Sequence, residues 1–391
     1  MAYRPPLFLL NISYLPLVPG RQKRNEAIFI HLLKDTGLFS GGIFINPVCT
    51  HAKYNECKVD TESYDNISFP VSQLSLSGPL HKRSNLDLKL IAGRYAELIK
   101  THWIKGQPYL LWMNTAERFE YFLARHLLLE AKIKLFDLSD DFTTFKHSRP
   151  HIFNERLNRL IEVSDGLLCV NKYVQNKFPH RRSVVLNNGT DFDSFQRVDA
   201  AFTMPPLFPK LPHKKYIGYC GGILERRMDM KLLRKLFDKF SDCVFVFVGY
   251  YNNRRFITEF MQDDHVYYFP EVPYSQLQNI VSSFDVAIIP HQVNEATSGN
   301  DLLKLYDYLA CGIPVVSTPC SDLQRFDSLI YVISDPDHFC DMVESIIGGD
   351  ISSNSSAAKQ YAKSCSWESR IRILSKWLED DIIGRGRMSS V

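Results

Sequence analysis

Two charged residues lie one helical turn apart in the stretch NDLLKLYDYLACGIPVVST, which begins at residue 300. Lys304 and Asp307 would share one face of a helix. An ammonium group binds phosphate oxygens, and a carboxylate accepts hydrogen bonds from two hydroxyl groups at once. The alternative is an exposed ion pair, which contributes only about 0.3–0.5 kcal/mol. The spacing alone leaves both interpretations open.

A glycine pair followed by two arginines forms a second candidate site, in GYCGGILERRMD. Gly221 and Gly222 permit a tight turn and a close approach of backbone to a ligand, and Arg226 and Arg227 add permanent cations. A diphosphate would fit there. The segment is neither GxGxxG nor GxxxxGK[ST], which argues against a hydride-transfer enzyme and a Walker-type NTPase. The alternative is an ordinary strand-to-helix turn with surface arginines.

Further donor-binding candidates lie where predicted strands end. Gly249 closes CVFVFVG, Pro290 closes FDVAIIP, and Thr297 lies in the small, polar loop that follows. The backbone near Leu305 opens the next helix, whose N–H groups would point toward an anionic ligand. If the glycine turn holds one side of a diphosphate, Lys304 can hold the other and stabilise a leaving group, which also makes it a catalytic candidate.

Asp140 and Asp141 in LSDDF follow another predicted strand and are the remaining catalytic candidates. They would bind donor or acceptor hydroxyl groups, or form a helix N-cap and its neighbour; the two interpretations weigh equally. Arg21, Lys23 and Arg24 are weaker candidates for phosphate contact. A basic surface loop is the better account of these three residues.

The elements around the lysine and aspartate follow from local propensity. Asn300 and Asp301 predict the N-cap of a helix, and Gly312 predicts its left-handed end. Pro314 cannot extend the helix, and the run PVVST is typical of a strand buried on both faces of a parallel sheet.

Apolar, β-rich runs alternate with helical segments along the whole chain, which predicts α/β architecture with parallel, doubly wound sheets. In the first half these runs are PLFLLNISYL, GGIFINPV, YLLWMNT, IKLFDLSD, GLLCVN and SVVLNNG; in the second half they are KYIGYCGG, CVFVFVG, VYYFPEV, FDVAIIPH, IPVVST and LIYVIS. A proline-rich stretch without amphipathic period separates the two sets. The predicted division is a domain over 1–195, a linker over 196–214, a second domain over 215–365 and a closing helix with the tail over 366–391.

Composition narrows the class of protein. The chain has 391 residues, of which 45% are hydrophobic and 23% charged, as in ordinary globular proteins. No apolar run is long enough for a membrane span, and the first residues lack a signal-peptide core, so we expect a cytoplasmic protein. The nine cysteines show no zinc-like spacing and are expected to be reduced.

Charge is uneven along the chain. Residues 1–200 hold 26 Lys and Arg against 20 Asp and Glu, a balance of +6, whereas the rest has −3. A basic half favours peripheral contact with an anionic membrane, at its inner face, or with an anionic acceptor; a solvated basic face is the alternative. No nucleic-acid partner is expected.

Several segments resemble one family. LLKLYDYLACGIPVV resembles the string PLKLYEYLAAGKPVV of the glycogen-synthase-like, group 1 retaining glycosyltransferases, which include enzymes of teichuronic acid and capsule-type surface polysaccharides. LFDLSDDF, VLNNGTDFDSF, KYIGYCGGILERRMD, SSFDVAIIPH and CSWESRIRIL resemble further motifs of this family, in the same order. The resemblance covers most of residues 130–380 and is weak before about residue 100.

The resemblance implies the GT-B fold, in which two Rossmann-like domains with doubly wound parallel sheets face each other across a cleft. It implies donor-diphosphate contacts from the glycine turn, its arginines and Lys304, and ribose contacts from Asp307. Two departures stand out. The family's first acid would fall at position 299, which is Gly299, and the usual lysine after the glycine turn is missing, with Asp229 and Met230 in that region.

The expected function is transfer of a sugar from a nucleotide-diphosphate donor to a lipid-linked or polysaccharide acceptor in surface glycan assembly, with retention. Cations and helix N-termini can stabilise the leaving group, so neither a metal nor another cofactor is expected. One alternative is a nucleotide-sugar epimerase on the same architecture. The other is a non-catalytic nucleotide-sugar binder or scaffold, which Gly299 favours.

Overall fold

The structure is a computed structural model, and it describes residues 6–13, 24–46, 71–74, 84–145, 147, 149–196, 211, 213–351 and 354–384. The chain divides into two compact units. Unit 1 comprises Met1–Asn187 and Trp367–Val391, and unit 2 comprises Asn188–Ser366. The chain therefore passes from unit 1 to unit 2 after Asn187, before the domain end predicted at residue 195. Most of the predicted linker lies outside the described residues.

Unit 1 is built on a seven-stranded parallel sheet with the order β3-β2-β1-β4-β5-β6-β7. Its strands are β1 (Leu7–Ile12), β2 (Phe39–Ile45), β3 (Val71–Leu74), β4 (Tyr109–Met113), β5 (Ile133–Leu138), β6 (Gly166–Cys169) and β7 (Ser183–Val185). The six strands predicted in this half are present. The seventh, β3, was not predicted, because a four-residue strand in a polar region has no distinctive pattern.

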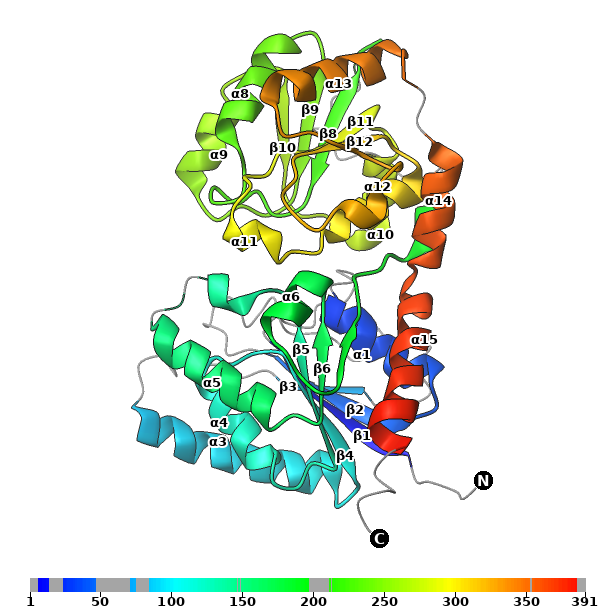
Figure 1. The fold of residues 1–391 in the computed structure, drawn as a ribbon. Coiled ribbons are helices and arrows are strands. Elements are labelled where there is room, and N and C mark those ends of the chain that lie inside the picture. Colours follow the sequence, from blue (N-terminus) through cyan, green and yellow to red (C-terminus); the bar gives the residue numbers. More distant parts are fainter. Residues whose placement is uncertain are drawn as a thin grey trace. The chain divides into compact units, whose positions relative to one another are not determined.

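Helices cover both faces of this sheet (Figure 1). The helical elements of unit 1 are α1 (Arg24–Asp35), α3 (Asn85–Ile99), η3 (Lys100–Ile104), α4 (Arg118–Leu127), η4 (Phe142–Thr144), α5 (Pro150–Glu162), α6 (Lys172–Lys177), α15 (Trp367–Trp377) and η6 (Leu378–Ile383). One apolar core joins the sheet to α3, α4 and α5. On the other face α15 packs beside α1, so the last helices of the chain return to unit 1.

Unit 2 is built on a six-stranded parallel sheet with the order β10-β9-β8-β11-β12-β13. Its strands are β8 (Tyr216–Cys220), β9 (Val244–Val248), β10 (Val266–Phe269), β11 (Val286–Ile289), β12 (Val315–Ser317) and β13 (Tyr331–Val332). All six were predicted. The α/β class with doubly wound parallel sheets is therefore confirmed for both units.

The helices of unit 2 also lie in two layers (Figure 1). The helical elements are α7 (Phe192–Phe195), α8 (Met230–Lys239), α9 (Arg254–Phe260), α10 (Tyr274–Val281), α11 (Glu295–Ser298), α12 (Leu303–Cys311), η5 (Gln324–Phe326), α13 (Pro336–Gly348) and α14 (Ser355–Ser364). One core joins the sheet to α8, α9 and α13, and a second joins it to α10, α12 and α14. Apolar side chains on both faces of each strand explain the continuous hydrophobic runs.

Candidate functional site

The two central strands of unit 2 bring distant segments together. In the order β10-β9-β8-β11-β12-β13, successive strands are added to one side of β8 and then, from β11 onward, to the other side. Ligands of doubly wound sheets bind at such a switch point, beyond the carboxyl ends of the strands. Gly221 and Gly222 follow β8, and Pro290 follows β11. Three predicted donor-binding residues from two separate segments thus lie at one end of neighbouring strands.

Backbone hydrogen bonds join the glycine loop, residues 221–229, to the end of β11. The Asp229 N–H group donates to the Pro290 carbonyl oxygen over 2.8 Å, and Met228 pairs with His291 in an isolated antiparallel bridge. The two segments therefore form one surface, and the carbonyl of Pro290 is occupied in holding it.

The glycines of this surface are required by close packing. Gly221 has a φ of +130°, and a Cβ atom there would lie 2.6 Å from Lys304 Cε. Gly249 has a φ of +145°, and its Cβ would collide with the carbonyl oxygen of Gly221. At Gly222 a Cβ would lie 3.0 Å from the Tyr250 ring. Gly221 therefore makes room for the lysine, whereas Gly249 keeps the ends of β8 and β9 in contact.

Helix α12 begins later than its sequence predicts. The N-cap is Leu302, with no side-chain cap, so the prediction that Asn300 or Asp301 caps the helix is wrong. Gly312 ends the helix with a φ of 74°, as predicted. The physical reason for the shift is that the Asp301 carboxylate has stronger partners elsewhere.

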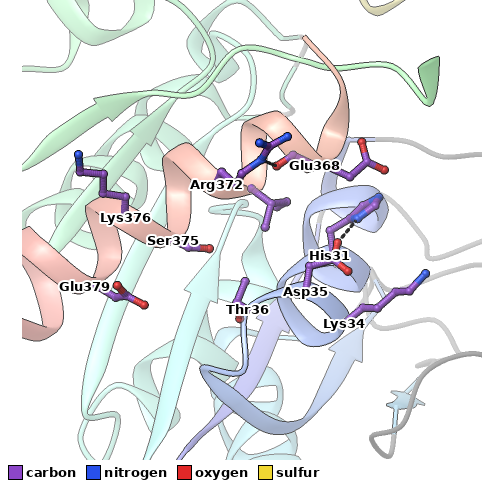
Figure 2. A pocket seen from close by; sticks show the side chains of 10 residues that line it. His31, Lys34, Asp35, Thr36, Glu368, Arg372, Ser375, Lys376 and Glu379 are labelled. Atoms are coloured by element: carbon purple, nitrogen blue, oxygen red, sulfur yellow. Dashed lines mark hydrogen bonds and ion pairs between the residues drawn. The ribbon is translucent and has the colours of Figure 1, made fainter. Parts of the chain in front are cut away.

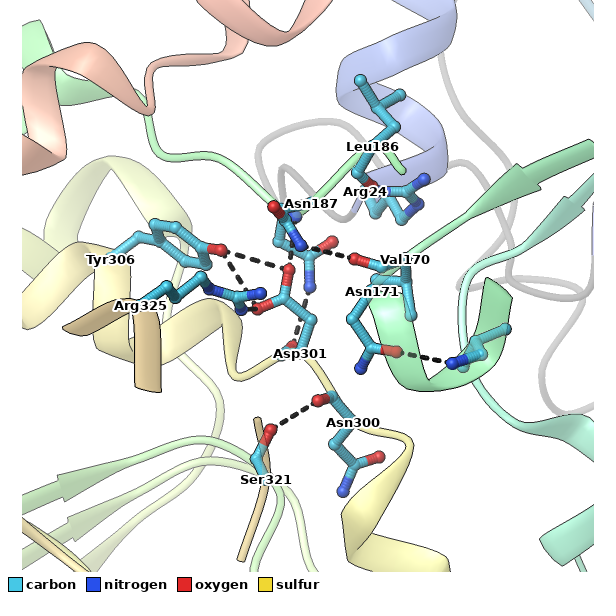
Figure 3. A network of polar contacts seen from close by, with 12 residues as sticks. Arg24, Val170, Asn171, Leu186, Asn187, Asn300, Asp301, Tyr306, Ser321 and Arg325 are labelled. Carbon is cyan, nitrogen blue, oxygen red and sulfur yellow. Dashed lines mark hydrogen bonds and ion pairs between the residues drawn. The ribbon is translucent and has the colours of Figure 1, made fainter. Parts of the chain in front are cut away.

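Asp301 is the centre of a buried polar network (Figure 3). Its carboxylate accepts hydrogen bonds from the Asn188 backbone N–H over 2.6 Å and from the Tyr306 hydroxyl over 3.1 Å, and it pairs with Arg325. Both carboxylate oxygens are thereby engaged. Asp301 therefore does not replace the acid that the family has at the position of Gly299.

Lys304 lies against a buried tyrosine. Its ammonium donates to the Tyr219 hydroxyl over 2.8 Å and lies 4.3 Å from the centre of that ring. Burial, followed by repulsion from Arg227, lowers the pKa of Lys304 from 10.5 to about 7, although the residue keeps some exposed surface. The thiols of Cys220 and Cys320 oppose this shift. Near neutral pH the amine can therefore be neutral until an anion arrives.

Asp307 is buried, with 3% of its surface exposed. Its Oδ1 atom accepts hydrogen bonds from the Thr190 hydroxyl over 2.7 Å and the Tyr274 hydroxyl over 2.8 Å. Burial raises the pKa of this carboxyl group from 3.8 to about 7, and the two hydroxyl groups oppose the rise. A surface ion pair between Lys304 and Asp307 is therefore the wrong interpretation. Contact between Asp307 and a ribose stays a prediction.

The two arginines of the glycine loop have different surroundings. Arg226 is exposed, whereas Arg227 is partly buried. Arg227 lies close enough to lower the pKa of both Lys304 and His291 by charge repulsion. The structure therefore assigns Arg227, rather than Arg226, to the immediate surroundings of Lys304.

Two other predicted donor contacts have roles inside the fold. The Thr297 hydroxyl has one proton to share between the carbonyl oxygens of Gln292 and Asn294, which lie 2.8 and 3.0 Å away, so it shapes the loop between β11 and α12. The Leu305 side chain is fully buried, and its N–H donates to the Leu302 carbonyl over 2.9 Å. Neither group is directed at a ligand in this arrangement.

The acidic pair of unit 1 also has local partners. Asp141 is 1% exposed, caps η4 by accepting from Thr143 N over 3.2 Å, and pairs with Lys177 over 2.6 Å. The N-cap interpretation is therefore confirmed for Asp141. Asp140 accepts from the Asp141 N–H over 2.8 Å and keeps a partly exposed side chain. Of the pair, Asp140 is the better placed to meet a substrate.

Arg24 is not part of a basic surface loop, which corrects the prediction for this residue. It begins α1, is 7% exposed, pairs with the buried Asp137 over 3.1 Å and donates to the Leu186 carbonyl over 2.6 Å. Burial raises the pKa of Asp137 and attraction to Arg24 lowers it; burial is the larger cause. Arg21 and Lys23 lie outside the described residues.

Sequence reasoning missed four residues of this site. Tyr219, His291, Thr190 and Tyr274 contact the predicted lysine or aspartate, directly or through one another. His291 directly follows Pro290, Thr190 lies in the segment VLNNGTDFDSF and Tyr219 lies in GYCGGILERRMD, so all three were within or next to recognised signals. Tyr274 carries no such signal.

A groove of about 660 Å³ lies apart from these residues, between α1 and α15 of unit 1 (Figure 2). Its lining residues are His31, Lys34, Asp35, Thr36, Glu368, Ile371, Arg372, Ser375, Lys376 and Glu379. Side chains of both charges line it, and His31 contacts Asp35 over 2.6 Å. None of the predicted site residues lines this groove.

Comparison with known proteins agrees with the geometry of unit 2. The family described as glycosyl transferases group 1 matches residues 214–348, which include the glycine loop, the end of β11 and α12. A Bacillus subtilis protein named for teichuronic acid biosynthesis, the glycosyltransferase TuaH, is 23% identical over 235 residues. That alignment covers 56% of this chain and 58% of TuaH, so it spans little more than half of the relative.

Solved structures show the fold over nearly the whole chain. Sucrose-phosphate synthase from Thermosynechococcus elongatus has a TM-score of 0.68 at 12% identity, covering 95% of this chain and 98% of its own. Anabaena HepE, solved with UDP and glucose, has a TM-score of 0.63 at 12% identity, covering 95% and 99%. The GT-B fold predicted from the resemblance is confirmed.

The described part of the chain was also compared with the requirements of a membrane-spanning helix and of a metal site. None of the described helices combines the length and apolar character that crossing a bilayer requires. Within the described residues, no three His, Cys, Asp or Glu side chains form a group able to hold a metal ion. Independence from metals was not tested by either observation and stays a prediction.

Proposed function

We propose that this protein is a glycosyltransferase that moves a sugar from a nucleotide-diphosphate donor to a lipid-linked or polysaccharide acceptor in surface glycan biosynthesis. The observation that carries the proposal is the position of Lys304 beside Gly221, at the switch point of unit 2. The names of TuaH and HepE, and the UDP and glucose bound to HepE, support the choice of substrate class.

The geometry supports stabilisation of a leaving group. As the bond between the sugar C1 and the phosphate oxygen breaks, the electron pair goes to the nucleotide diphosphate. Lys304 and Arg227 supply positive charge there, in a partly buried site where electrostatic stabilisation is stronger than in water. The acceptor hydroxyl forms the new bond to C1 and gives its proton to the departing phosphate. This route retains the configuration at C1 and assigns no step to a metal.

Asp307 and Asp140 have different proposed roles. Asp307 would accept hydrogen bonds from the ribose of the donor, while Thr190 and Tyr274 hold its Oδ1 atom. Asp140, at the end of β5 in unit 1, would bind a hydroxyl group of the donor or acceptor. The acceptor is a lipid-linked or free glycan, and a lipid-linked one would bring the protein to a membrane surface.

The two alternatives predict different products. An epimerase would change the sugar of the donor without a second substrate, and a scaffold would bind the donor without changing it. Incubation of the protein with a panel of nucleotide sugars and candidate acceptors, followed by chromatography, separates the three cases. We expect free nucleotide diphosphate, with more of it when an acceptor is present, and the same yield with excess EDTA.

The same assay tests the site. Lys304→Ala should abolish release of the nucleotide diphosphate, whereas Lys235→Ala, a lysine of unit 2 that forms an exposed ion pair with Asp337, should leave it unchanged. A changed sugar without transfer would establish the epimerase, and binding without any product would establish the scaffold.

A further inference from the structure

A buried histidine that the proposed reaction does not use adjoins Lys304. His291 is 1% exposed, and burial, with repulsion from Lys304 and Arg227, holds its pKa well below 6.5. Its imidazole is therefore neutral at physiological pH and carries one proton, on either Nδ1 or Nε2.

The partners of Tyr219 decide where that proton lies. The Tyr219 hydroxyl oxygen lies 2.8 Å from Lys304 Nζ, 3.0 Å from the Gly222 carbonyl oxygen and 3.0 Å from His291 Nε2. A hydroxyl group has one proton to donate and two lone pairs. The carbonyl can only accept, and the ammonium can only donate. All three bonds form together only if His291 donates from Nε2.

This assignment makes the three side chains one chain of hydrogen bonds. His291 donates to Tyr219, Tyr219 donates to Gly222, and the second lone pair of Tyr219 receives the Lys304 ammonium. The Tyr219 oxygen is thus held by the glycine loop and by His291, which lies two residues after β11. The His291 Nδ1 atom has no hydrogen-bond partner within the described residues.

We propose that Tyr219 and His291 are positioning residues of the donor site, which hold the Lys304 ammonium beside Gly221 for the diphosphate of the donor. The proposal rests on the proposed function, because it assigns the diphosphate to this lysine. Without these hydrogen bonds, the flexible lysine side chain would have to be ordered by each ligand that binds, at a cost in affinity.

The charged and titratable groups that bear on Lys304 come from several elements. Arg227 of the glycine loop repels the ammonium, whereas Cys220 at the end of β8 and Cys320 after β12 favour it. The hydroxyl oxygen of Tyr219 also favours the charged form, because it accepts from it. Removing that oxygen should therefore move the titration of Lys304 to lower pH, which a purely structural role of Tyr219 would not do.

Binding of inorganic pyrophosphate tests the proposal without knowledge of the sugar or base. Calorimetric titrations from pH 6 to 8 would compare the parent with Tyr219→Phe, His291→Leu and His291→Gln, with melting temperature as a control. At pH 7 we expect about tenfold weaker binding for Tyr219→Phe and His291→Leu. His291→Gln keeps an N–H donor and should remain within about threefold of the parent. The pH at which affinity falls by half should be lower for Tyr219→Phe than for the parent. Pyrophosphate itself also titrates, but this contribution is the same for all variants and does not affect the comparison.

Imidazole nitrogen shifts in ¹⁵N NMR spectra provide a measurement that needs no ligand, and we expect a neutral ring protonated at Nε2. Protonation at Nδ1, or parent-like pyrophosphate binding in both Tyr219→Phe and His291→Leu, would overturn the proposal. Binding that survives in Lys304→Met would instead overturn the donor site of the proposed function. The two failures are therefore distinguishable.

Discussion

Donor binding should change the proton count of the protein in opposite directions on the two sides of pH 7. Lys304 has a pKa lowered to about 7 and should take up a proton as the diphosphate binds. Asp307 has a pKa raised to about 7 and should release one as the ribose hydroxyl groups donate to it. The two groups titrate in the same pH range, so proton uptake by Lys304 and proton release by Asp307 partly cancel, and which of them is larger depends on the pH.

The expected magnitudes follow from the two pKa values. At pH 8 the free lysine is about 10% protonated and the free carboxyl group about 90% ionised, so binding should take up about 0.8 proton. At pH 6 the proportions are reversed, and binding should release about 0.8 proton. The net change passes through zero near pH 7. Affinity should be highest there and should fall by up to about tenfold for each pH unit on either side.

Calorimetry in buffers of different ionisation enthalpy measures the proton count directly. A nucleotide sugar is a suitable ligand, because its diphosphate is esterified at both ends and does not titrate between pH 6 and 8. Asp307→Asn should show proton uptake only. A proton change of the same sign at pH 6 and pH 8 in the parent, or none at either, would refute the reasoning.

Three further predictions have defined outcomes. The pKa of Asp307 in the folded protein lies above its unfolded value, so the stability that the protonated carboxyl group contributes below about pH 4 is lost as the pH rises through 7. The free energy of unfolding of Asp307→Asn, measured with urea, should therefore rise relative to that of the parent by up to roughly 4 kcal/mol between pH 4 and pH 8. Gly221→Ala should abolish nucleotide binding, because its Cβ would enter the space of the Lys304 side chain. Gly349→Ala is the control: Gly349 also has a positive φ, but no atom lies within 4 Å of its added Cβ, so this variant should lose only about 1 kcal/mol of stability and keep nucleotide binding. Arg227→Ala should weaken donor binding by about 2 kcal/mol, roughly thirtyfold, and Arg226→Ala by less than about threefold, because only the former is partly buried; equal losses in titrations of both would contradict this assignment.

Local patterns in the sequence were sufficient for the fold class and for part of the site. Buried parallel strands are continuous apolar runs, and twelve of the thirteen strands could be recognised from such runs. Gly312 ends its helix as its type predicts, because a left-handed residue is needed there whatever surrounds it. The glycine turn and Lys304 were also found separately, since each has a local signature.

Only the tertiary structure decided what these residues contact. Asp301 has a good N-cap side chain, yet it is engaged by Asn188 and Arg325, and no local rule contains residues so distant in the chain. Tyr219 and His291 meet because β8 and β11 are neighbours in the sheet, and strand order is a property of packing. Burial, which moves the pKa values of Lys304 and Asp307 toward 7, likewise depends on what the rest of unit 2 places around them.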